Sequence, residues 1–341
     1  MHFGIFDWVE ASDSLSPAQV YEHKLQLAAA ADRAGLHAIF LAEHQGTPLS
    51  IDASPSVLLS AIFQRTQRLR AGALTWCLPW YDPYRFYNEI CMLDQLSGGR
   101  LEVGVGRGVS PIESAIFGLT RIEQSRERYR ETLDVFFAAC RSPLLDFTGR
   151  HHEYRGVELH NRPVQRPYPP LWFPSSNRDS IAFTARHGYH TALMAKTADS
   201  RALFSEYREL WERHKDDAGR HNGHVALPFL AKTQHLVIAD NGAEAERLGV
   251  QAYEWWRAHI NHLTRREGRP ATLTLDPFSD DSVQRLIAGT PQTVAERLQE
   301  VIDATGLTYL LCIVSFGNLA PQTAMRSLEL FAAEVMPQLR P

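Results

Sequence analysis

The sequence predicts a single (β/α)8 TIM barrel of the α/β class that comprises residues 1–341. Short apolar runs alternate with amphipathic helical stretches from end to end, eight strand–helix units can be counted, and no flexible linker separates them. A doubly wound sheet is the alternative. That fold usually carries a Gly-x-Gly-x-x-Gly turn after its first strand, and this chain has Asp7-Trp8-Val9-Glu10 there instead.

The first half of the chain contains four of the predicted strands. These strands cover residues 2–6, 38–41, 69–75 and 101–105. The helices that follow them are expected at residues 17–34, 55–65, 83–95 and 123–140. Ser16 is the expected cap of the first helix, Pro17 suits its first turn, and Gly35 lies just past its end.

A proline-rich connection over residues 162–170 leads to the second half. Its strands are expected at residues 171–173, 191–194, 233–238 and 309–314. Its helices are expected at residues 179–187, 200–217, 243–262, 291–304 and 321–335. The irregular polar stretch 265–281 after the seventh strand is interrupted by proline and is too long for an ordinary connection. We therefore predict that it forms a lid over the mouth of the barrel.

Composition and charge exclude several classes of protein. A chain with 44% hydrophobic and 22% charged residues has the composition of a soluble globular protein. The net charge of −4 provides no basic field for nucleic acid. The four cysteines lie far apart without metal-ligand spacing, so we expect reduced thiols and no metal site. Without a basic leader or a long apolar run, the chain is expected to be cytoplasmic and free of the membrane.

Two neighbouring strand ends carry residues that suit a phosphate group. Arg107 follows Gly106 just beyond the fourth strand, where a planar guanidinium fork can meet an anion beside an unobstructed backbone. Ser176, Asn177 and Ser180 follow the fifth strand and offer donors at a helix amino terminus. The alternative is that Ser176 or Asn177 only caps the helix. The arginine on the adjacent unit favours the phosphate site.

His44 is the best candidate for chemistry. It comes directly after the second strand, where a histidine can accept a proton at the mouth of the barrel. The preceding Glu43 either orients the imidazole ring or pairs with a nearby cation. A single histidine among 15 is more often a surface or packing residue, so its position carries the argument.

Several aromatic residues lie on segments near the mouth. Aromatic side chains in barrels usually belong to the core, but those on loops can line a pocket for a planar cofactor or an apolar substrate. The residues concerned are Trp8, Trp76, Trp80, Tyr81, Trp255 and Trp256.

Motifs that share one known pattern run through nearly the whole chain. They are Met1-x-Phe3-Gly4-x-Phe6, Ala42-Glu43-His44, Leu78-Pro79 with Asp82-Pro83, Leu93-Asp94-Gln95-Leu96-Ser97-x-Gly99-Arg100, Gly106-Arg107-Gly108, Ile302-Asp303-Ala304-Thr305-Gly306 and Val335-Met336-Pro337. In this order they resemble the motifs of the bacterial luciferase-like monooxygenases, which are flavin-dependent (β/α)8 proteins.

The resemblance implies a two-component monooxygenase. Such a protein binds reduced FMN (FMNH2) from a separate NAD(P)H:flavin reductase, uses O2 to form a C4a-(hydro)peroxyflavin, and oxidises a small organic substrate. His44 is implied to be the catalytic histidine, and a non-proline cis peptide is implied at Leu74-Thr75 beside the flavin ring. The residues implied to bind the cofactor are Glu43, Leu74, Thr75, Gly106, Arg107, Ser176, Asn177 and Ser180. A homodimer formed through the helices after the second and third strands is implied as well.

Some positions depart from the luciferase pattern. Gln45 and Gly46 replace a histidine and an aromatic residue, Gly106 replaces a cysteine, and Ser110 replaces a tyrosine beside the aldehyde pocket. These departures argue against long-chain aldehyde oxidation and light emission, and they leave flavin binding intact. Two alternatives keep the barrel: hydride transfer with the deazaflavin F420, and a non-catalytic flavin-binding protein. His44 and a full-length lid argue against the second.

Overall fold

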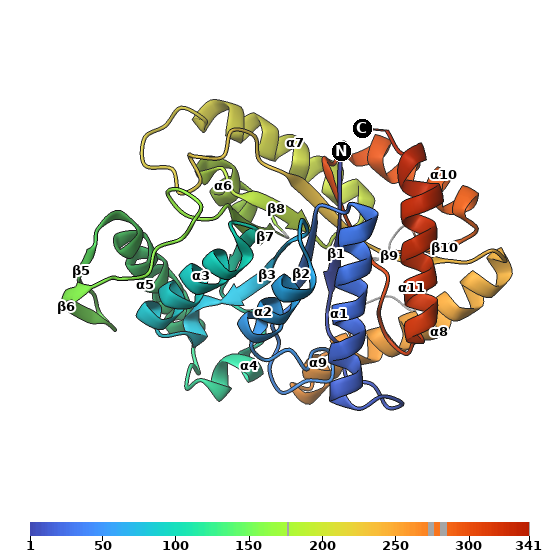
Figure 1. Cartoon of the computed structure of the whole chain (residues 1–341), viewed down its shortest axis with the longest axis horizontal. Helices are drawn as coiled ribbons and strands as arrows, with labels where there is room; N and C mark the ends of the chain where they lie inside the picture. Colours follow the sequence, from blue (N-terminus) through green and yellow to red (C-terminus); the bar gives the residue numbers. More distant parts are fainter. Residues whose placement is uncertain (176, 272–275, 280–284, 341) are drawn as a thin grey trace.

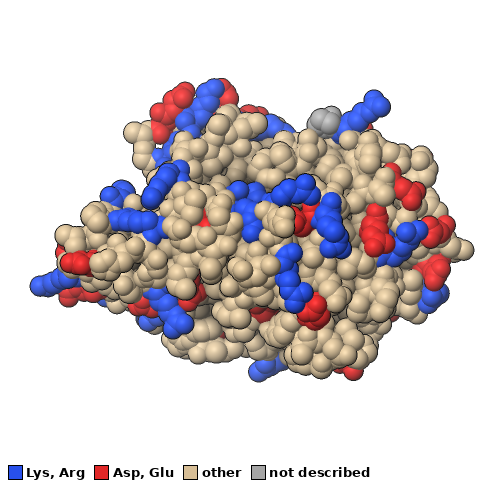
Figure 2. All heavy atoms as spheres, in the orientation of Figure 1, with Lys and Arg blue, Asp and Glu red and all other residues tan. Residues whose placement is uncertain are grey.

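Eight parallel strands close into a barrel surrounded by helices in the computed structural model of the chain (Figure 1). The structure describes residues 1–175, 177–271, 276–279 and 285–340. The predicted (β/α)8 fold is confirmed. No helix in the described part of the chain is long and apolar enough to cross a membrane. On the face shown in Figure 2, positive and negative side chains are both scattered over the surface.

The observed strands and major helices match the predicted ones closely. The barrel strands are β1 (His2–Asp7), β2 (Ala38–Leu41), β3 (Arg70–Cys77), β4 (Leu101–Gly106), β7 (Leu171–Ser175), β8 (His190–Leu193), β9 (Leu230–Ile238) and β11 (Tyr309–Ile313). The helices that follow these strands are α1 (Pro17–Ala34), α2 (Pro55–Arg65), α3 (Pro83–Ser97), α5 (Ile122–Arg141), α6 (Arg178–His187), α7 (Thr197–His214), α8 (Gly242–Ile260), α10 (Pro291–Thr305) and α11 (Pro321–Leu330). Neighbouring strands pair in the order β1-β2-β3-β4-β7-β8-β9-β11, and β11 pairs with β1 to close the barrel.

Several smaller elements were not predicted. They are the antiparallel hairpin β5 (Leu144–Thr148) and β6 (Glu153–Glu158), the short helices α4 (Pro111–Ile116) and α9 (His262–Arg266), strand β10 (Leu286–Gly289), and the helical turns Leu78–Trp80 and Met336–Gln338. The last predicted helix, over residues 321–335, is divided into α11 and the helical turn Phe331–Val335. The hairpin projects from the side of the barrel (Figure 1). Its turn is held by the Glu131 carboxylate of α5, which accepts the backbone N–H groups of Arg150, His151 and His152.

The predicted lid over residues 265–281 is described only in part. Its first two residues, Arg265 and Arg266, belong to α9. Residues 272–275 and 280–281 lie outside the described residues, so the role of this segment as a lid stays a prediction. In Figure 1, α4 and α9 lie together at the end of the barrel where β1 ends.

Near the mouth, the pairing partner of β9 changes from β8 to β10. Residues 230–232 of β9 pair with β8, whereas residues 235–238 pair with β10. Helix α8 connects β9 to β10, and its Tyr253 and Trp256 are buried in one cluster with Trp8 and Val237. Helix α8 therefore covers part of the mouth of the barrel.

Alternation along the strands divides the apolar core in two. In β11, Tyr309, Leu311 and Ile313 point into the barrel, while Leu310 and Cys312 pack against the surrounding helices. This period of two follows from the pleat of a β-strand. The barrel interior is consequently filled with side chains at its centre, and a ligand can enter only at the mouth.

Buried histidines line the amino-terminal end of the barrel. The His190 ring is fully buried, and its Nδ1 accepts the backbone N–H of Phe229 at 2.7 Å. Burial lowers the pKa of His190 to about 3 and that of His37 to about 4. The folded protein therefore holds both rings in the neutral state.

These histidines predict a loss of stability in acid. A pKa lowered by folding gives stability that is complete above the unfolded value of about 6.5 and is lost as the pH falls toward the folded value. Between pH 7 and pH 5 the free energy of unfolding should fall by about 2 kcal/mol for each such ring. His190→Asn should reduce the difference between the free energies of unfolding at pH 7 and pH 5 by about 2 kcal/mol. Urea unfolding at the two pH values measures this difference.

His160→Asn is the matched control, because the His160 side chain is 87% exposed. It should leave the difference between pH 7 and pH 5 unchanged. An equal pH dependence in His190→Asn and the unaltered protein would contradict the assignment.

Candidate active site

The carboxyl ends of the barrel strands converge on one mouth, and the predicted site residues follow these ends. Glu43 and His44 follow β2, Leu74 and Thr75 lie near the end of β3, and Arg107 follows β4. Asn177 and Ser180 lie at the start of α6 after β7, and Ser176 lies outside the described residues.

His44 is oriented by a carboxylate from a distant part of the sequence. Its Nδ1 lies 3.0 Å from Oε1 of Glu113, and the Gln45 backbone N–H donates to the same oxygen at 2.7 Å. Glu113 is buried on α4, while the His44 side chain is 17% exposed. The Nε2 atom of His44 makes no hydrogen bond within the described part of the chain, so it is the atom available to exchange a proton.

Glu113 was missed because the short helix α4 was not predicted. A signal for it exists in the sequence Ser110-Pro111-Ile112-Glu113, which has the Ser-x-x-Glu spacing of a helix start with proline at its first turn. In the structure the Ser110 hydroxyl accepts the Glu113 backbone N–H and also donates to the Glu267 carboxylate at 3.2 Å. Ser110 thereby joins α4 to the segment that follows α9.

Among the described residues, Glu43 neither hydrogen-bonds to His44 nor forms an ion pair with a cation. Its carboxyl accepts the Cys77 backbone N–H at 2.7 Å and the Tyr81 hydroxyl at 2.8 Å. Burial raises its pKa to about 8, and the nearby Asp52 carboxylate contributes to the increase. Glu43 thus ties the end of β2 to the turn after β3, and its carboxyl holds a proton for much of the time at neutral pH.

The peptide bond between Leu74 and Thr75 is cis, as the resemblance predicted. Around it, β3 contains one residue more than β4. Ala73 pairs with Val103 and Trp76 with Val105, so two residues of β3 lie opposite one residue of β4. Glycines on β4 face this irregularity. A Cβ atom on Gly104 would overlap the Ala73 carbonyl oxygen, and one on Gly106 would overlap the Thr75 hydroxyl. Only glycine lets β4 pass β3 at this point.

Arg107 is half-buried, and none of the described carboxylates forms an ion pair with its guanidinium. Burial lowers its pKa, and the neighbouring Arg126 adds to the decrease. The register of β4 with β7 ends at the pair Gly104 and Trp172, so Arg107 and the start of α6 follow two neighbouring strands at the mouth. A half-buried guanidinium without a carboxylate partner is suited to bind an anion.

The start of α6 has the geometry of a capped helix. The Asn177 side chain accepts the Ser180 backbone N–H at 3.0 Å, and the Ser180 hydroxyl donates to the Asn177 carbonyl at 2.8 Å. The capping alternative therefore describes Asn177 correctly. The amino terminus of α6 still carries the positive end of the helix dipole, which favours a negative charge, as the Arg107 guanidinium does.

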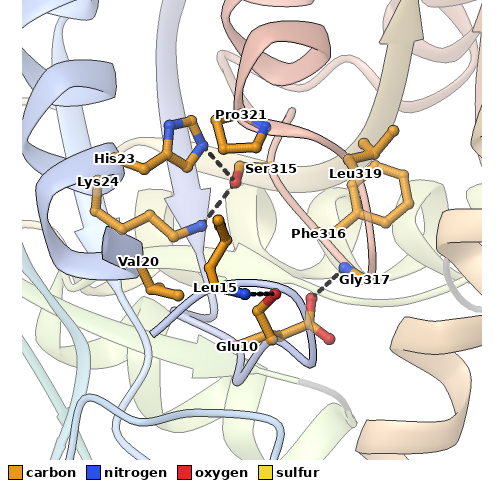
Figure 3. Close-up of a pocket in the computed structure, with 11 residues that line it drawn as sticks. Glu10, Leu15, Val20, His23, Lys24, Ser315, Phe316, Gly317, Leu319 and Pro321 are labelled. Atoms are coloured by element: carbon orange, nitrogen blue, oxygen red, sulfur yellow. Dashed lines mark hydrogen bonds between the residues drawn. The ribbon is translucent and has the colours of Figure 1, made fainter. Parts of the chain in front are cut away.

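A small polar cavity lies at the rim between α1 and the turn after β11 (Figure 3). Its volume is about 30 Å³, which is room for a water molecule and not for a cofactor. Lys24 donates to Ser315 at 2.7 Å and forms an ion pair with Asp7 at 2.9 Å. Glu10 accepts the Gly317 backbone N–H at 2.6 Å. These contacts fix the rim and leave the mouth as the candidate active site.

Comparison with known proteins identifies relatives along the whole chain. A sequence model of the luciferase-like monooxygenases matches residues 1–308. An uncharacterized protein of Sinorhizobium fredii, y4wF, is 32% identical over 336 residues, which are 98% of this chain and 96% of that protein. The oxygenase component of a flavin-dependent trigonelline monooxygenase from Acinetobacter baylyi is 24% identical over 314 residues, or 89% and 84% of the two chains.

Solved structures share the fold of this chain. The oxygenating constituent of 3,6-diketocamphane monooxygenase from Pseudomonas putida, in complex with FMN, matches with a TM-score of 0.83 and 20% identity over 100% of this chain and 99% of that one. An F420-dependent secondary alcohol dehydrogenase matches with a TM-score of 0.73 and 16% identity over 100% and 99% of the two chains. At these identities the likeness shows the fold alone.

The close approach of β3 and β4 yields a prediction on stability. Gly104→Ala forces a methyl group against a main-chain oxygen that cannot turn away, so it should destabilise the fold by about 1–3 kcal/mol. Urea unfolding measures this change. Gly223→Ala is the matched control, because its added methyl group would make only ordinary contacts. Equal stability of the two variants would show that β3 and β4 lie farther apart.

Proposed function

Because the chain belongs to the luciferase-like monooxygenase family, whose relatives are flavin-dependent oxidoreductases, we propose that it is the FMN-dependent oxygenase component of a two-component monooxygenase. In this proposal it binds reduced FMN, which supplies the electrons that activate O2, and it transfers one oxygen atom to a small organic substrate. A separate NAD(P)H:flavin reductase supplies the reduced flavin. The relative named as an oxygenase component supports this division of labour.

The unpaired guanidinium of Arg107 carries the proposal. FMN differs from riboflavin by a phosphate group. The Arg107 guanidinium follows β4, the neighbour of the strand that leads to α6, and has no carboxylate partner among the described residues. The α6 dipole adds to the attraction for a dianion. We propose that Arg107, Asn177 and Ser180, together with Ser176, hold the phosphate. The residues present therefore fit the group that the family implies.

We propose that the flavin ring lies against the irregularity of β3. Leu74 and Thr75 lie near the end of β3, and the Thr75 side chain packs on Gly106 of β4, so these residues would form the wall against which a flat ring packs. Glu43 contacts Cys77 and Tyr81 in the turn after β3, so its proposed role is to position that turn.

His44 is proposed as the catalytic residue. Its Nδ1 is fixed by Glu113 at 3.0 Å, which leaves Nε2 to give or take a proton at the mouth. A buried carboxylate behind the ring stabilises the protonated imidazole without contacting the substrate. The segment 265–281 is proposed to exclude water, which would otherwise release oxygen as peroxide.

A homodimer is proposed through α2 and α3. Val57 on α2 and Met92 and Leu96 on α3 are exposed apolar side chains, so both helices offer apolar surface to a second copy of the chain. These two helices follow the second and third barrel strands, where the resemblance places the contact.

Replacement of Arg107 tests the phosphate site. In titrations monitored by flavin fluorescence, the protein should bind FMN at least about tenfold more tightly than riboflavin. Arg107→Ala should weaken FMN binding about 10- to 100-fold and leave riboflavin binding unchanged. Arg130→Ala, an exposed position on α5, is the control.

The same titration with F420 distinguishes the alternative cofactor. Binding of F420 in preference to FMN would replace the proposal by F420-dependent hydride transfer. Equal binding of FMN and riboflavin would contradict the phosphate site itself. Reaction of the FMNH2-loaded protein with O2 at the rate of free FMNH2 would favour the non-catalytic flavin-binding protein.

Replacement of Glu113 tests the positioning of His44. The rate at which the FMNH2-loaded protein reacts with O2 should depend on the imidazole ring that Glu113 orients. His44→Asn and Glu113→Gln should each change this rate about tenfold, and the double variant should change it no further, because both replacements act on the same ring. Stopped-flow absorbance measures the rate, and FMN binding monitored by fluorescence should stay unchanged. A double variant in which the two effects add would remove Glu113 from this role.

A further inference from the structure

Val9 adopts a backbone conformation that a β-branched residue rarely takes. Its φ is +54°, and in the described part of the chain it is the single residue other than glycine with a positive φ. In this left-handed region the Cβ atom of an L-residue crowds the neighbouring carbonyl oxygen, so the conformation is unfavourable for valine. The contacts around Val9 must therefore hold the turn in place.

The Asp7 carboxylate holds this turn. Its Oδ1 atom accepts the Val9 backbone N–H at 2.7 Å, and the Val9 carbonyl accepts the backbone N–H of Ile51 at 2.9 Å. Asp7 is 1% exposed, so its charge-assisted hydrogen bond to Val9 is shielded from water.

A buried cation compensates the charge of Asp7. The Lys24 ammonium of α1 lies 2.9 Å from the same Oδ1 atom. Lys24 also donates to the Ser315 hydroxyl at 2.7 Å, and Figure 3 shows this contact beside the small polar cavity. The carboxylate that holds the turn after β1 is thus fixed by α1 and by the turn after β11.

The turn at Val9 sets the direction of Trp8. Val9 packs in the outer part of the core, whereas Trp8 belongs to the inner cluster. The Trp8 ring lies 4.8 Å from the Phe6 ring and 5.7 Å from the His44 ring, measured between centroids. The His44 ring is therefore held by two groups, the Glu113 carboxylate at Nδ1 and the Trp8 ring beside it.

We propose that Asp7 is a positioning residue for His44: by accepting the Val9 N–H it keeps the turn left-handed, and the turn keeps the Trp8 ring beside the imidazole. This inference rests on the proposed function of His44. An imidazole held from two sides occupies fewer orientations, so its Nε2 atom is more often placed to exchange a proton. Asp7 touches no reacting atom and acts only through the backbone and Trp8.

Two variants that differ only in the acceptor at position 7 test this role. Both carry Lys24→Met, so that neither leaves a buried charge without its partner. Asp7→Ala removes the acceptor of the Val9 N–H, whereas Asp7→Asn keeps a side-chain oxygen that can accept it. The alanine variant should therefore release Trp8 from His44, and the asparagine variant should retain it.

NMR of the flavin-free protein, labelled with 13C in its histidine rings, reports where the His44 ring lies. The His44 signal is the one that His44→Asn removes. Because the Trp8 ring current acts on this signal, the alanine variant should move it about as far as Trp8→Leu does, and the asparagine variant should leave it near its original place. Glu22→Gln, at an exposed ion pair of α1 with Arg65, is the control and should not move it.

The reaction with O2 shows whether the position of the ring matters. In stopped-flow absorbance of the FMNH2-loaded protein, the alanine variant and Trp8→Leu should each change the rate about tenfold, and the asparagine variant should change it less than about threefold. FMN binding monitored by fluorescence should stay unchanged. Trp8→Leu leaves the ion pair intact, so it tests the contact with His44 even if the alanine variant does not fold.

A purely structural role for Asp7 would lower the stability of both variants without moving the His44 signal. An unmoved signal in the folded alanine variant, equal shifts in the alanine and asparagine variants, or an unchanged rate in Trp8→Leu would each overturn the inference. A protein that does not bind FMN but shows the expected shifts keeps Asp7 in this role and loses the proposed function. A protein that binds FMN through Arg107 without these shifts shows the reverse.

Discussion

Between Ala73 and Trp76, β3 runs so close to β4 that only hydrogen atoms fit on Gly104 and Gly106. The rest of the mouth is arranged around this contact. The cis bond between Leu74 and Thr75 lies within the contact on the β3 side, and Arg107 follows directly after Gly106 on the β4 side. The residues that pack β3 against β4 therefore also form part of the candidate site. This close packing explains the glycines at positions 104 and 106.

The elements that the sequence could predict are those with strong local signals. The barrel strands and their helices follow from apolar runs, helix caps and glycine stops, as at Ser16 and Gly35, and these signals act within a few residues. The positions of His44 and Arg107 follow from the barrel itself, since any residue just past a strand reaches the mouth. The cis bond followed from the resemblance alone.

The elements that could not be predicted depend on contacts between distant residues. Glu113 reaches His44 across 69 positions on a helix of six residues, which carries too few apolar residues to show a helical period. Strand β10 is four residues long and gains its partner only where β8 leaves β9. Glu43 was one candidate to orient the His44 ring because the two residues are neighbours in sequence. Side chains of successive residues leave a strand in different directions, so the carboxylate that orients His44 comes from Glu113 instead.

The Glu10 contacts have a mechanical consequence for α8. Glu10 accepts the His259 Nδ1–H at 2.8 Å near the end of α8 and the Gly317 backbone N–H at 2.6 Å. Gly317 also packs so closely on the Ala252 carbonyl that no side chain fits between them. Helix α8 is thus held in its second half, at Ala252 and at His259, by residues that follow β1 and β11. A displacement of this half of the helix would break its contacts with both strand ends.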